Sequence, residues 1–260
     1  MTGDGMAVAA AMLRDATHVV VLTGAGVSAE SGLATFRDPQ ADPSDPDAAY
    51  WSRSDPMQMA TPEGFHANPA LVQRWYRWRM HRGEAALPNP GHEAIARLER
   101  EMSRRGGSST LLTQNVDGLH HAAGSELVFE LHGSILRWRC ARCSTPATDL
   151  GEPTEDTPMT CRCGGALRPG VVWFGEALPQ DVLAAASEAL ERCDVFMSVG
   201  TSAVVFPAAG FIESARVRGA STIEVNRDPT PITSMVDVSL LGQSGDLLPR
   251  LIDAAFDGAG

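Results

Sequence analysis

The chain has 260 residues, 43% of them apolar and 20% charged, which is long enough for one sizeable core and ordinary for a globular protein. Its formal net charge of −11 argues against nucleic-acid binding, which requires clustered Lys and Arg, and favours basic peptides as partners. No apolar run approaches the length of a membrane span and the first residues lack a secretion signal, so we expect a cytoplasmic monomer with no membrane partner.

Short apolar runs typical of buried parallel strands alternate with helical patterns along the chain. Prolines that mark helix starts precede three of these patterns, which cover residues 92–101, 180–193 and 208–218. The alternation predicts an α/β fold with a Rossmann-like parallel sheet. The strands are expected at residues 18–22, 109–112, 127–130, 195–199, 221–225 and 236–241.

Two segments interrupt this alternation. Residues 38–54 are rich in Pro and Asp and are typical of a mobile loop that closes over a ligand. Residues 137–168 hold four of the five cysteines and too few apolar residues for a core of their own. The Ala- and Gly-rich residues 254–260 are expected to be a frayed end. We therefore expect a Rossmann-like core at 1–37, 89–136 and 169–260, a loop and helical insertion at 38–88, and a small module at 137–168.

A glycine-rich turn follows the first strand, in the run GAGVSAESGLATFRD that begins at Gly24. Glycines at such a turn let backbone N–H groups approach a pyrophosphate at a helix N-terminus. The spacing differs from that of dehydrogenases and no acidic residue follows at the ribose-binding distance, so a tight structural turn is the alternative. The polar side chains that favour a ligand are Ser28, Glu30, Ser31 and Arg37.

Four cysteines form two closely spaced pairs, Cys140-x-x-Cys143 and Cys161-x-Cys163. Two such pairs can present four thiolates to Zn²⁺ in a closed structural site. Disulfides are the alternative, which a reducing compartment disfavours. Cys193 precedes a predicted strand, and we expect it to be a buried core thiol.

Polar groups also follow two further predicted strands, where ligands bind in open α/β sheets. The run TQNVDGLH begins at Thr113, and its amides and carboxylate are suited to holding a carboxamide or a water, although Asn115 or Asp117 could simply cap a helix. His132 follows the strand at 127–130 and is a candidate general base or a structural histidine. The apolar stretches 171–176 and 200–205 could be core, or strand edges for an extended peptide.

These motifs, taken together with LHGS, VVWFGE, GTSAVVFP and the late VNRD, occur in an order that resembles the sirtuin family from residue 24 to residue 228. The resemblance implies a cleft between a Rossmann domain and a zinc ribbon, in which NAD and an acyl-lysine protein substrate meet. In that family the acyl oxygen displaces nicotinamide from the ribose, and a histidine relays a proton so that O-acyl-ADP-ribose and free lysine are released. Mono-ADP-ribosyl transfer, or NAD sensing without catalysis, would use the same pocket.

The resemblance also implies roles for individual residues. His132 would be the catalytic base, and Gln114, Asn115 and Asp117 would surround the nicotinamide and its ribose, with the last two also serving catalysis. The substrate peptide would lie against Val171, Val172, Phe174, Gly175 and Glu176. The remaining NAD contacts would come from Gly24, Ala25, Gly26, Ser28, Thr35, Phe36, Arg37, Gly200, Thr201, Ser202, Asn226 and Ser244.

A predicted helix after Pro69 carries Tyr76 and Arg79, which are three residues apart and so share a face. Arg can bind a carboxylate in bidentate fashion and Tyr adds a hydroxyl donor, so the pair is suited to an acidic acyl group, unless the arginine merely packs on an aromatic ring. With Ala60 upstream, the pattern resembles the sirtuins that remove succinyl, malonyl and glutaryl groups. The chain departs from the family in its loop at 38–49 and in having Ser244 where Ala is usual.

Overall fold

The computed structural model describes residues 2–33 and 55–257. Its larger domain is built on one sheet of parallel strands, as the sequence predicts, in the order β3-β2-β1-β7-β8-β9. Each strand lies close to its expected position because continuous apolar runs are buried on both faces of the sheet. The strands are β1 (His18–Thr23), β2 (Ser108–Thr113), β3 (Val128–Glu130), β7 (Val195–Val199), β8 (Ser221–Asn226) and β9 (Val238–Leu241).

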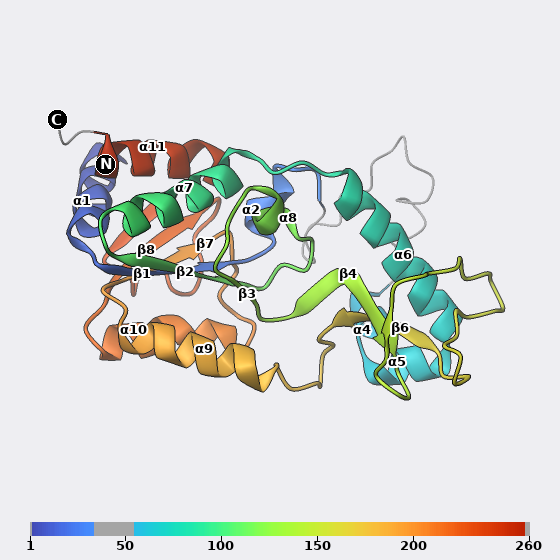
Figure 1. Cartoon of the computed structure of the whole chain (residues 1–260). Coiled ribbons are helices and arrows are strands. Elements are labelled where there is room, and N and C mark those ends of the chain that lie inside the picture. The colour runs from blue at the N-terminus through green and yellow to red at the C-terminus, as the bar shows by residue number, and fades with distance from the viewer. Residues whose placement is uncertain (1, 34–54, 258–260) are drawn as a thin grey trace.

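Helices cover both faces of this sheet (Figure 1). One face carries α1 (Thr2–Asp15), α7 (Pro90–Arg104) and α11 (Ser244–Phe256), and the other carries α9 (Gln180–Glu191) and α10 (Phe211–Val217). The side chains of β1 alternate between the two cores, with Val19 and Val21 packed on one side and Val20 and Leu22 on the other. Among the described residues, no helix combines the length and the apolar character needed to cross a bilayer.

Three helical details differ from the sequence-based expectation. Helices α1 and α11 were not expected. The prediction of a frayed end at 254–260 is wrong for residues 254–256, which form the last part of α11. Ala255 is only 1% exposed there, because alanine favours helix and its small side chain packs into the core beside α1. The helix expected at 208–218 begins as a 3₁₀ turn, η1 (Ala208–Gly210), before α10.

A smaller domain combines helices and a second sheet. Helices α4 (Pro56–Met59), α5 (Pro62–Ala67) and α6 (Pro69–Ala85) lie beside antiparallel strands β4 (Gly133–Cys140), β5 (Pro146–Ala147) and β6 (Leu167–Val171). Trp138, Met159 and Leu167 are buried in one cluster with Val72 and Trp75 of α6. The cysteine-bearing segment therefore shares a core with the helical insertion, which explains how so few apolar residues suffice.

Strand β1 lies between β2 and β7, so the chain leaves it first toward one edge of the sheet and later toward the other. At such a switch point the loops after neighbouring strands separate and leave a crevice at the carboxyl ends. Two short helices, α2 (Gly26–Ala29) and α8 (Leu119–Ala122), follow β1 and β2 there. The helix starts predicted at Asn68-Pro69 and Asn89-Pro90 are confirmed, since the side chains of Asn68 and Asn89 cap α6 and α7.

Candidate active site

A pocket of about 1580 Å³ opens at the carboxyl ends of the parallel strands and reaches the smaller domain. Thr35, Phe36 and Arg37, like the loop at 38–54, lie outside the described residues. All the other predicted NAD- and substrate-binding residues line this one pocket: Gly24, Ala25, Gly26, Ser28, Ala60, Tyr76, Arg79, Gln114, Asn115, Asp117, His132, Val171, Val172, Phe174, Gly175, Glu176, Gly200, Thr201, Ser202, Asn226 and Ser244.

The glycine-rich turn packs directly against the loop that follows β7. The backbone N–H of Gly26 donates to the Gly200 carbonyl at 2.8 Å, and that of Gly24 donates to the Val199 carbonyl at 3.1 Å. A Cβ on Gly26 would lie 2.6 Å from the Gly200 oxygen, so only glycine allows this approach. The two readings of the turn are thus compatible, because the same glycines close a tight turn and line the pocket.

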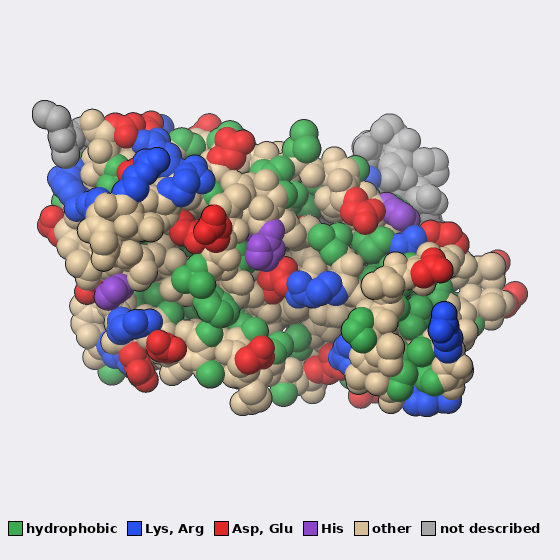
Figure 2. Space-filling view, in the orientation of Figure 1, with side chains coloured by type: hydrophobic (Ala, Val, Ile, Leu, Met, Phe, Trp, Pro, Cys, Tyr) green, Lys and Arg blue, Asp and Glu red, His purple; other side chains and the backbone are tan. Residues whose placement is uncertain are grey.

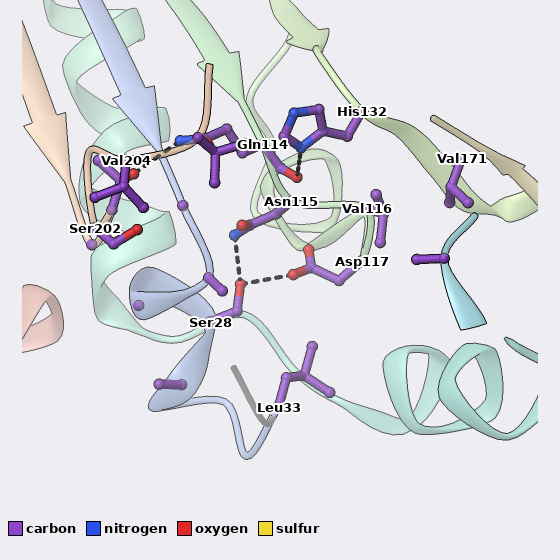
Figure 3. Close-up of a pocket in the computed structure, with 18 of the residues that line it drawn as sticks. Ser28, Leu33, Gln114, Asn115, Val116, Asp117, His132, Val171, Ser202 and Val204 are labelled. Carbon is purple, nitrogen blue, oxygen red and sulfur yellow. Dashed lines mark hydrogen bonds between the residues drawn. The ribbon is translucent and has the colours of Figure 1, made fainter. Parts of the chain in front are cut away.

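Ser28 is the centre of a buried hydrogen-bond network (Figure 3). Its hydroxyl donates to Asp117 Oδ2 at 2.8 Å and accepts from Asn115 Nδ2 at 3.0 Å. His92 Nδ1 accepts from the backbone N–H of Asn89, so His92 Nε2 carries the proton and donates to Ser28 Oγ at 3.3 Å. Every group of the network therefore has a defined donor or acceptor role, which fixes the side chains of Asn115 and Asp117.

Asp117 also supports the alternative that the sequence leaves open, because its Oδ1 accepts from the backbone N–H of Leu119 at 2.9 Å at the start of α8. One carboxylate thus accepts the first N–H of α8, whose N-cap residue is Gly118, and also joins the pocket network. Sequence reasoning missed His92 as a part of this network. The sequence analysis placed His92 only at the start of a helix, and the structure adds a capping box between His92 and Asn89 there.

His132 has one ring nitrogen held by the protein. Its Nδ1 lies 3.1 Å from the carbonyl oxygen of Gln114, which accepts only, so Nδ1 carries the proton and Nε2 has a free lone pair. Figure 3 shows the ring above Gln114 and next to the pocket. Burial lowers the pKa of His132 below its ordinary value of 6.5, against the opposing effect of the Gln114 hydrogen bond. The imidazole is therefore neutral near pH 7 and can accept a proton.

At the far end of the pocket, Glu30 connects the glycine-rich turn to α11. Its Oε1 accepts from the Ser244 hydroxyl and from the backbone N–H of Gly245, both at 2.9 Å. A serine in place of alanine at 244 therefore adds a hydrogen bond at the N-terminus of α11. Asn226, at the end of β8, donates to the Asp228 carbonyl at 2.7 Å and lies in the same part of the pocket wall.

On the side of the smaller domain, Tyr76 and Arg79 both face the pocket, as their spacing predicts. The Arg79 guanidinium lies 4.7 Å from the ring centre of Trp75, so it also packs on an aromatic ring. Burial raises the pKa of Tyr76 to about 12, which keeps its hydroxyl protonated. Burial also lowers the pKa of Arg79, whereas Tyr76 and Asp117 act to raise it, so an anion at this site would be a favourable partner.

Residues 172–174, which follow β6, form backbone hydrogen bonds to other parts of the chain at every second residue. The backbone N–H of Val172 donates to the His132 carbonyl and that of Phe174 to the Ala60 carbonyl, each at 2.9 Å. These bonds hold the stretch between His132 and Ala60, and Val171 lies across the pocket from Ser202 in Figure 3. Large apolar side chains are exposed on both sides of the opening, namely Phe174, Val204, Val205 and Phe206.

The four cysteines of the small module converge away from the pocket. Their sulfur atoms all lie within 4.8 Å of one another, and the Cys140–Cys163 and Cys143–Cys161 distances are 3.5 and 3.8 Å. Tetrahedral Zn²⁺ with Zn–S bonds of about 2.3 Å requires S–S separations of about 3.8 Å, so the set fits zinc. The thiols are free and no disulfide joins them, while Cys193 is buried as predicted.

The family model described as the Sir2 family matches residues 24–207. The chain belongs to the Sir2 family. It is 49% identical over 243 residues to the NAD-dependent protein deacylase 2 of Pyrobaculum aerophilum, covering 93% of this chain and 92% of that protein. The resemblance to sirtuins is therefore confirmed, although no comparison distinguishes a branch that prefers succinyl groups.

Solved structures of Sir2 proteins have the same fold as this chain. A crystal structure of a Sir2 homologue in complex with NAD superposes with a TM-score of 0.84 at 41% identity, covering 96% of this chain and 94% of that one. A Sir2 protein bound to a myristoylated histone peptide superposes with a TM-score of 0.73 at 33% identity, covering 97% and 96%. The Rossmann-like sheet with a four-cysteine module is thus the fold of the family.

Proposed function

We propose that this NAD-dependent protein deacylase of the Sir2 family removes succinyl and malonyl groups, as well as acetyl groups, from the lysine side chains of proteins. The observation that supports the acidic-acyl part is the placement of Tyr76 and Arg79 together in the wall of the pocket that also contains His132. We further propose that the core residues 1–37, 89–136 and 169–260 bind NAD, and that the acyl-lysine lies between residues 171–176 of this core and the insertion at 38–88, whose Ala60, Tyr76 and Arg79 line the pocket. The module at 137–168 would support this insertion through their shared core.

The pocket fits NAD by its size and by its donors. It extends from Asn226 and Ser244, past the glycine-rich turn, to Asn115 and His132, and it ends at the smaller domain. We propose that Ser202, Asn226 and Ser244 contact the adenosine part, that the Gly24–Gly26 turn and Thr201 contact the phosphates, and that Gln114, Asn115 and Asp117 contact the nicotinamide and its ribose. NAD, when bound, would supply the ribose that loses nicotinamide and accepts the acyl group on one of its hydroxyl oxygens.

In this proposal His132 is the general base. Its Nδ1–H is fixed on the Gln114 carbonyl, so Nε2 can accept a proton from a ribose hydroxyl and the resulting imidazolium keeps its hydrogen bond. Asn115 and Asp117 are held by Ser28, so the amide and the carboxylate need not reorganise when a substrate binds. The residues of the chain thus supply orientation and one proton acceptor.

At the acyl end, Arg79 would pair with the carboxylate of a succinyl group and Tyr76 would donate its hydroxyl proton to the same group. Ala60, with its small side chain in the wall, leaves room for the longer chain. An acetyl group has no carboxylate and would leave both donors to water or to the protein. The two donors should therefore matter for acidic acyl groups and little for acetyl.

The test compares succinyl- and acetyl-lysine peptides of one sequence, with NAD, in the wild type and in Tyr76→Phe and Arg79→Met variants. We expect Arg79→Met to lower kcat/KM for the succinyl peptide by about 100-fold, and Tyr76→Phe by about tenfold, because charge-assisted hydrogen bonds are lost. Turnover of the acetyl peptide should change less than threefold. Equal losses on both peptides would show that the pair is structural and would refute the acyl preference.

A further inference from the structure

Four side chains form a continuous series from the loop after β6 to the acyl end of the pocket. Arg168 donates to both carboxylate oxygens of Glu176, at 2.6 and 2.8 Å. The guanidinium carbon of Arg168 lies 3.5 Å from the ring centre of Trp173, and the indole N–H of Trp173 donates to the Tyr76 hydroxyl at 3.0 Å. Sequence reasoning treated Trp173 only as part of an apolar stretch.

The direction of the last hydrogen bond determines where the Tyr76 proton can go. An indole N–H can only donate, so the Tyr76 oxygen is the acceptor and the hydroxyl proton must point elsewhere. Tyr76 is 3% exposed, and within the described part of the chain its hydroxyl has no acceptor. A buried hydroxyl donor without an acceptor is unfavourable, so the site is complete only when a pocket ligand or a water accepts this proton.

Trp173 itself is held on several sides. Its ring is 2% exposed, lies against Arg168, and is 5.1 Å from the ring of Phe65. Its backbone N–H donates to Glu176 Oε2 at 2.9 Å, so one carboxylate binds both the backbone of Trp173 and the guanidinium that covers its ring. The indole N–H is thereby fixed in direction, and the Tyr76 hydroxyl with it.

We propose that Trp173, held by Arg168, is a positioning residue for acyl selectivity, which turns the Tyr76 hydroxyl so that its proton is presented to an acidic acyl group. This inference rests on the proposed function of Tyr76 and Arg79. An acetyl group offers a methyl where an acidic group offers a carboxylate, so the effect of Trp173 is confined to acidic substrates. In this role Trp173 acts through the Tyr76 hydroxyl.

The primary test is a double-mutant cycle between Trp173→Phe and Tyr76→Phe, measured as the ratio of kcat/KM for succinyl- and acetyl-lysine peptides. Trp173→Phe keeps an aromatic ring under Arg168 and removes the N–H. We expect it to lower the ratio by about three- to tenfold, through KM, because one oriented hydrogen bond is lost. In the Tyr76→Phe background the same change should have no further effect on the ratio.

Trp138→Phe is the matched control, since Trp138 is a buried tryptophan of the same domain whose indole N–H donates to the Ile135 carbonyl at 3.1 Å. It should leave the ratio unchanged. Arg168→Lys should lower the ratio as Trp173→Phe does, because an ammonium group cannot bind both Glu176 oxygens and cover the ring. If Tyr76→Phe lowers the ratio and Trp173→Phe does not, or if their effects add, the positioning role is refuted. If Tyr76→Phe itself has no effect, the proposed function fails first.

A second measurement does not depend on the stability of Trp173→Phe. The chain has five tryptophans, so a ¹⁵N spectrum contains five indole N–H signals. In the folded Tyr76→Phe protein, one of these signals should move upfield as its hydrogen bond is lost, and in the wild type the same signal should respond to a succinyl peptide and much less to an acetyl peptide. An unchanged set of indole signals in Tyr76→Phe would overturn the proposal.

Discussion

At the scale of single residues, the chemistry depends on which ring nitrogen of each histidine carries the proton. His92 and His132 each have Nδ1 bound to the backbone, but His92 accepts there and His132 donates. Nε2 of His92 is consequently a donor to Ser28, whereas Nε2 of His132 is an acceptor on the pocket side. The two histidines therefore have different roles, and only His132 is suited to be the base.

The pH dependence of the deacylation follows from this assignment. A base acts in its neutral form, which predominates above its pKa, and burial lowers the pKa of His132 below 6.5. We therefore expect kcat/KM to fall on acidification with a midpoint below pH 6.5. His132→Ala should retain NAD binding, measured by calorimetry, and lose turnover by at least about 100-fold. A variant with retained turnover would show that another group is the base.

At this scale the sequence predicted which residues face the pocket, because polar groups at the carboxyl ends of parallel strands meet at one edge. It could not predict the connections of Ser28 with His92 or of Trp173 with Tyr76. Each of these joins segments more than 60 residues apart in the chain. Such contacts depend on the packing of separate elements, which no local pattern encodes.

At the scale of elements, the three-stranded sheet and α6 share one core next to the four cysteines. Cys140, in β4, is itself buried in the cluster that contains Trp138 and Trp75. Bound zinc would hold the two cysteine pairs together, so its loss should release β4 and β6 from α6 and expose this core. Folding of the smaller domain and metal binding are therefore coupled.

We expect one zinc per chain, and chelation to lower the melting temperature and to abolish turnover. Cys140→Ser should lose the metal. Cys193→Ala is the matched control because Cys193 is a buried thiol outside the cluster, so this variant should keep its zinc. Zinc content is measured by atomic spectroscopy and unfolding by circular dichroism. A metal-free protein with unchanged melting would contradict the coupling.

The elements also show where sequence patterns succeed and fail. The six strands were predicted because they are short apolar runs with clear borders, and α7 because Asn89-Pro90 marks its start. Helix α11 was missed because it has Pro249 inside and runs into the Gly-containing end DGAG at 257–260, both of which argue against helix locally. Its burial against α1 and α7 outweighs these local signals.

At the scale of the whole molecule, the basic side chains are unevenly distributed over the surface. In the view of Figure 2, basic side chains gather over the α1 and α7 end of the larger domain. Part of this basic surface is neutralised within the chain, since Arg97 of α7 pairs with Asp253 and Asp257 at 2.5 Å. The pocket with its exposed apolar rim lies toward the other end of the domain.

All 21 basic residues of the chain are arginines, and the sequence contains no lysine. A lysine deacylase of this composition cannot be its own substrate. Reactive acyl thioesters likewise cannot modify a lysine side chain of this protein. We expect incubation with succinyl-CoA to add mass only at the α-amino group, measured on the intact protein, and to leave turnover unchanged. Serum albumin, which is rich in lysine, serves as the positive control. Loss of activity without N-terminal modification would contradict this expectation.

The most direct test of the account is the product balance of a single reaction. The purified protein is incubated with NAD and an acyl-lysine peptide, and nicotinamide, deacylated peptide and O-acyl-ADP-ribose are quantified by mass spectrometry. We predict the three products in a 1:1:1 ratio, formed at least about 100-fold more slowly by His132→Ala. Nicotinamide released with ADP-ribose attached to protein, and no deacylated peptide, would instead identify ADP-ribosyl transfer and contradict the account.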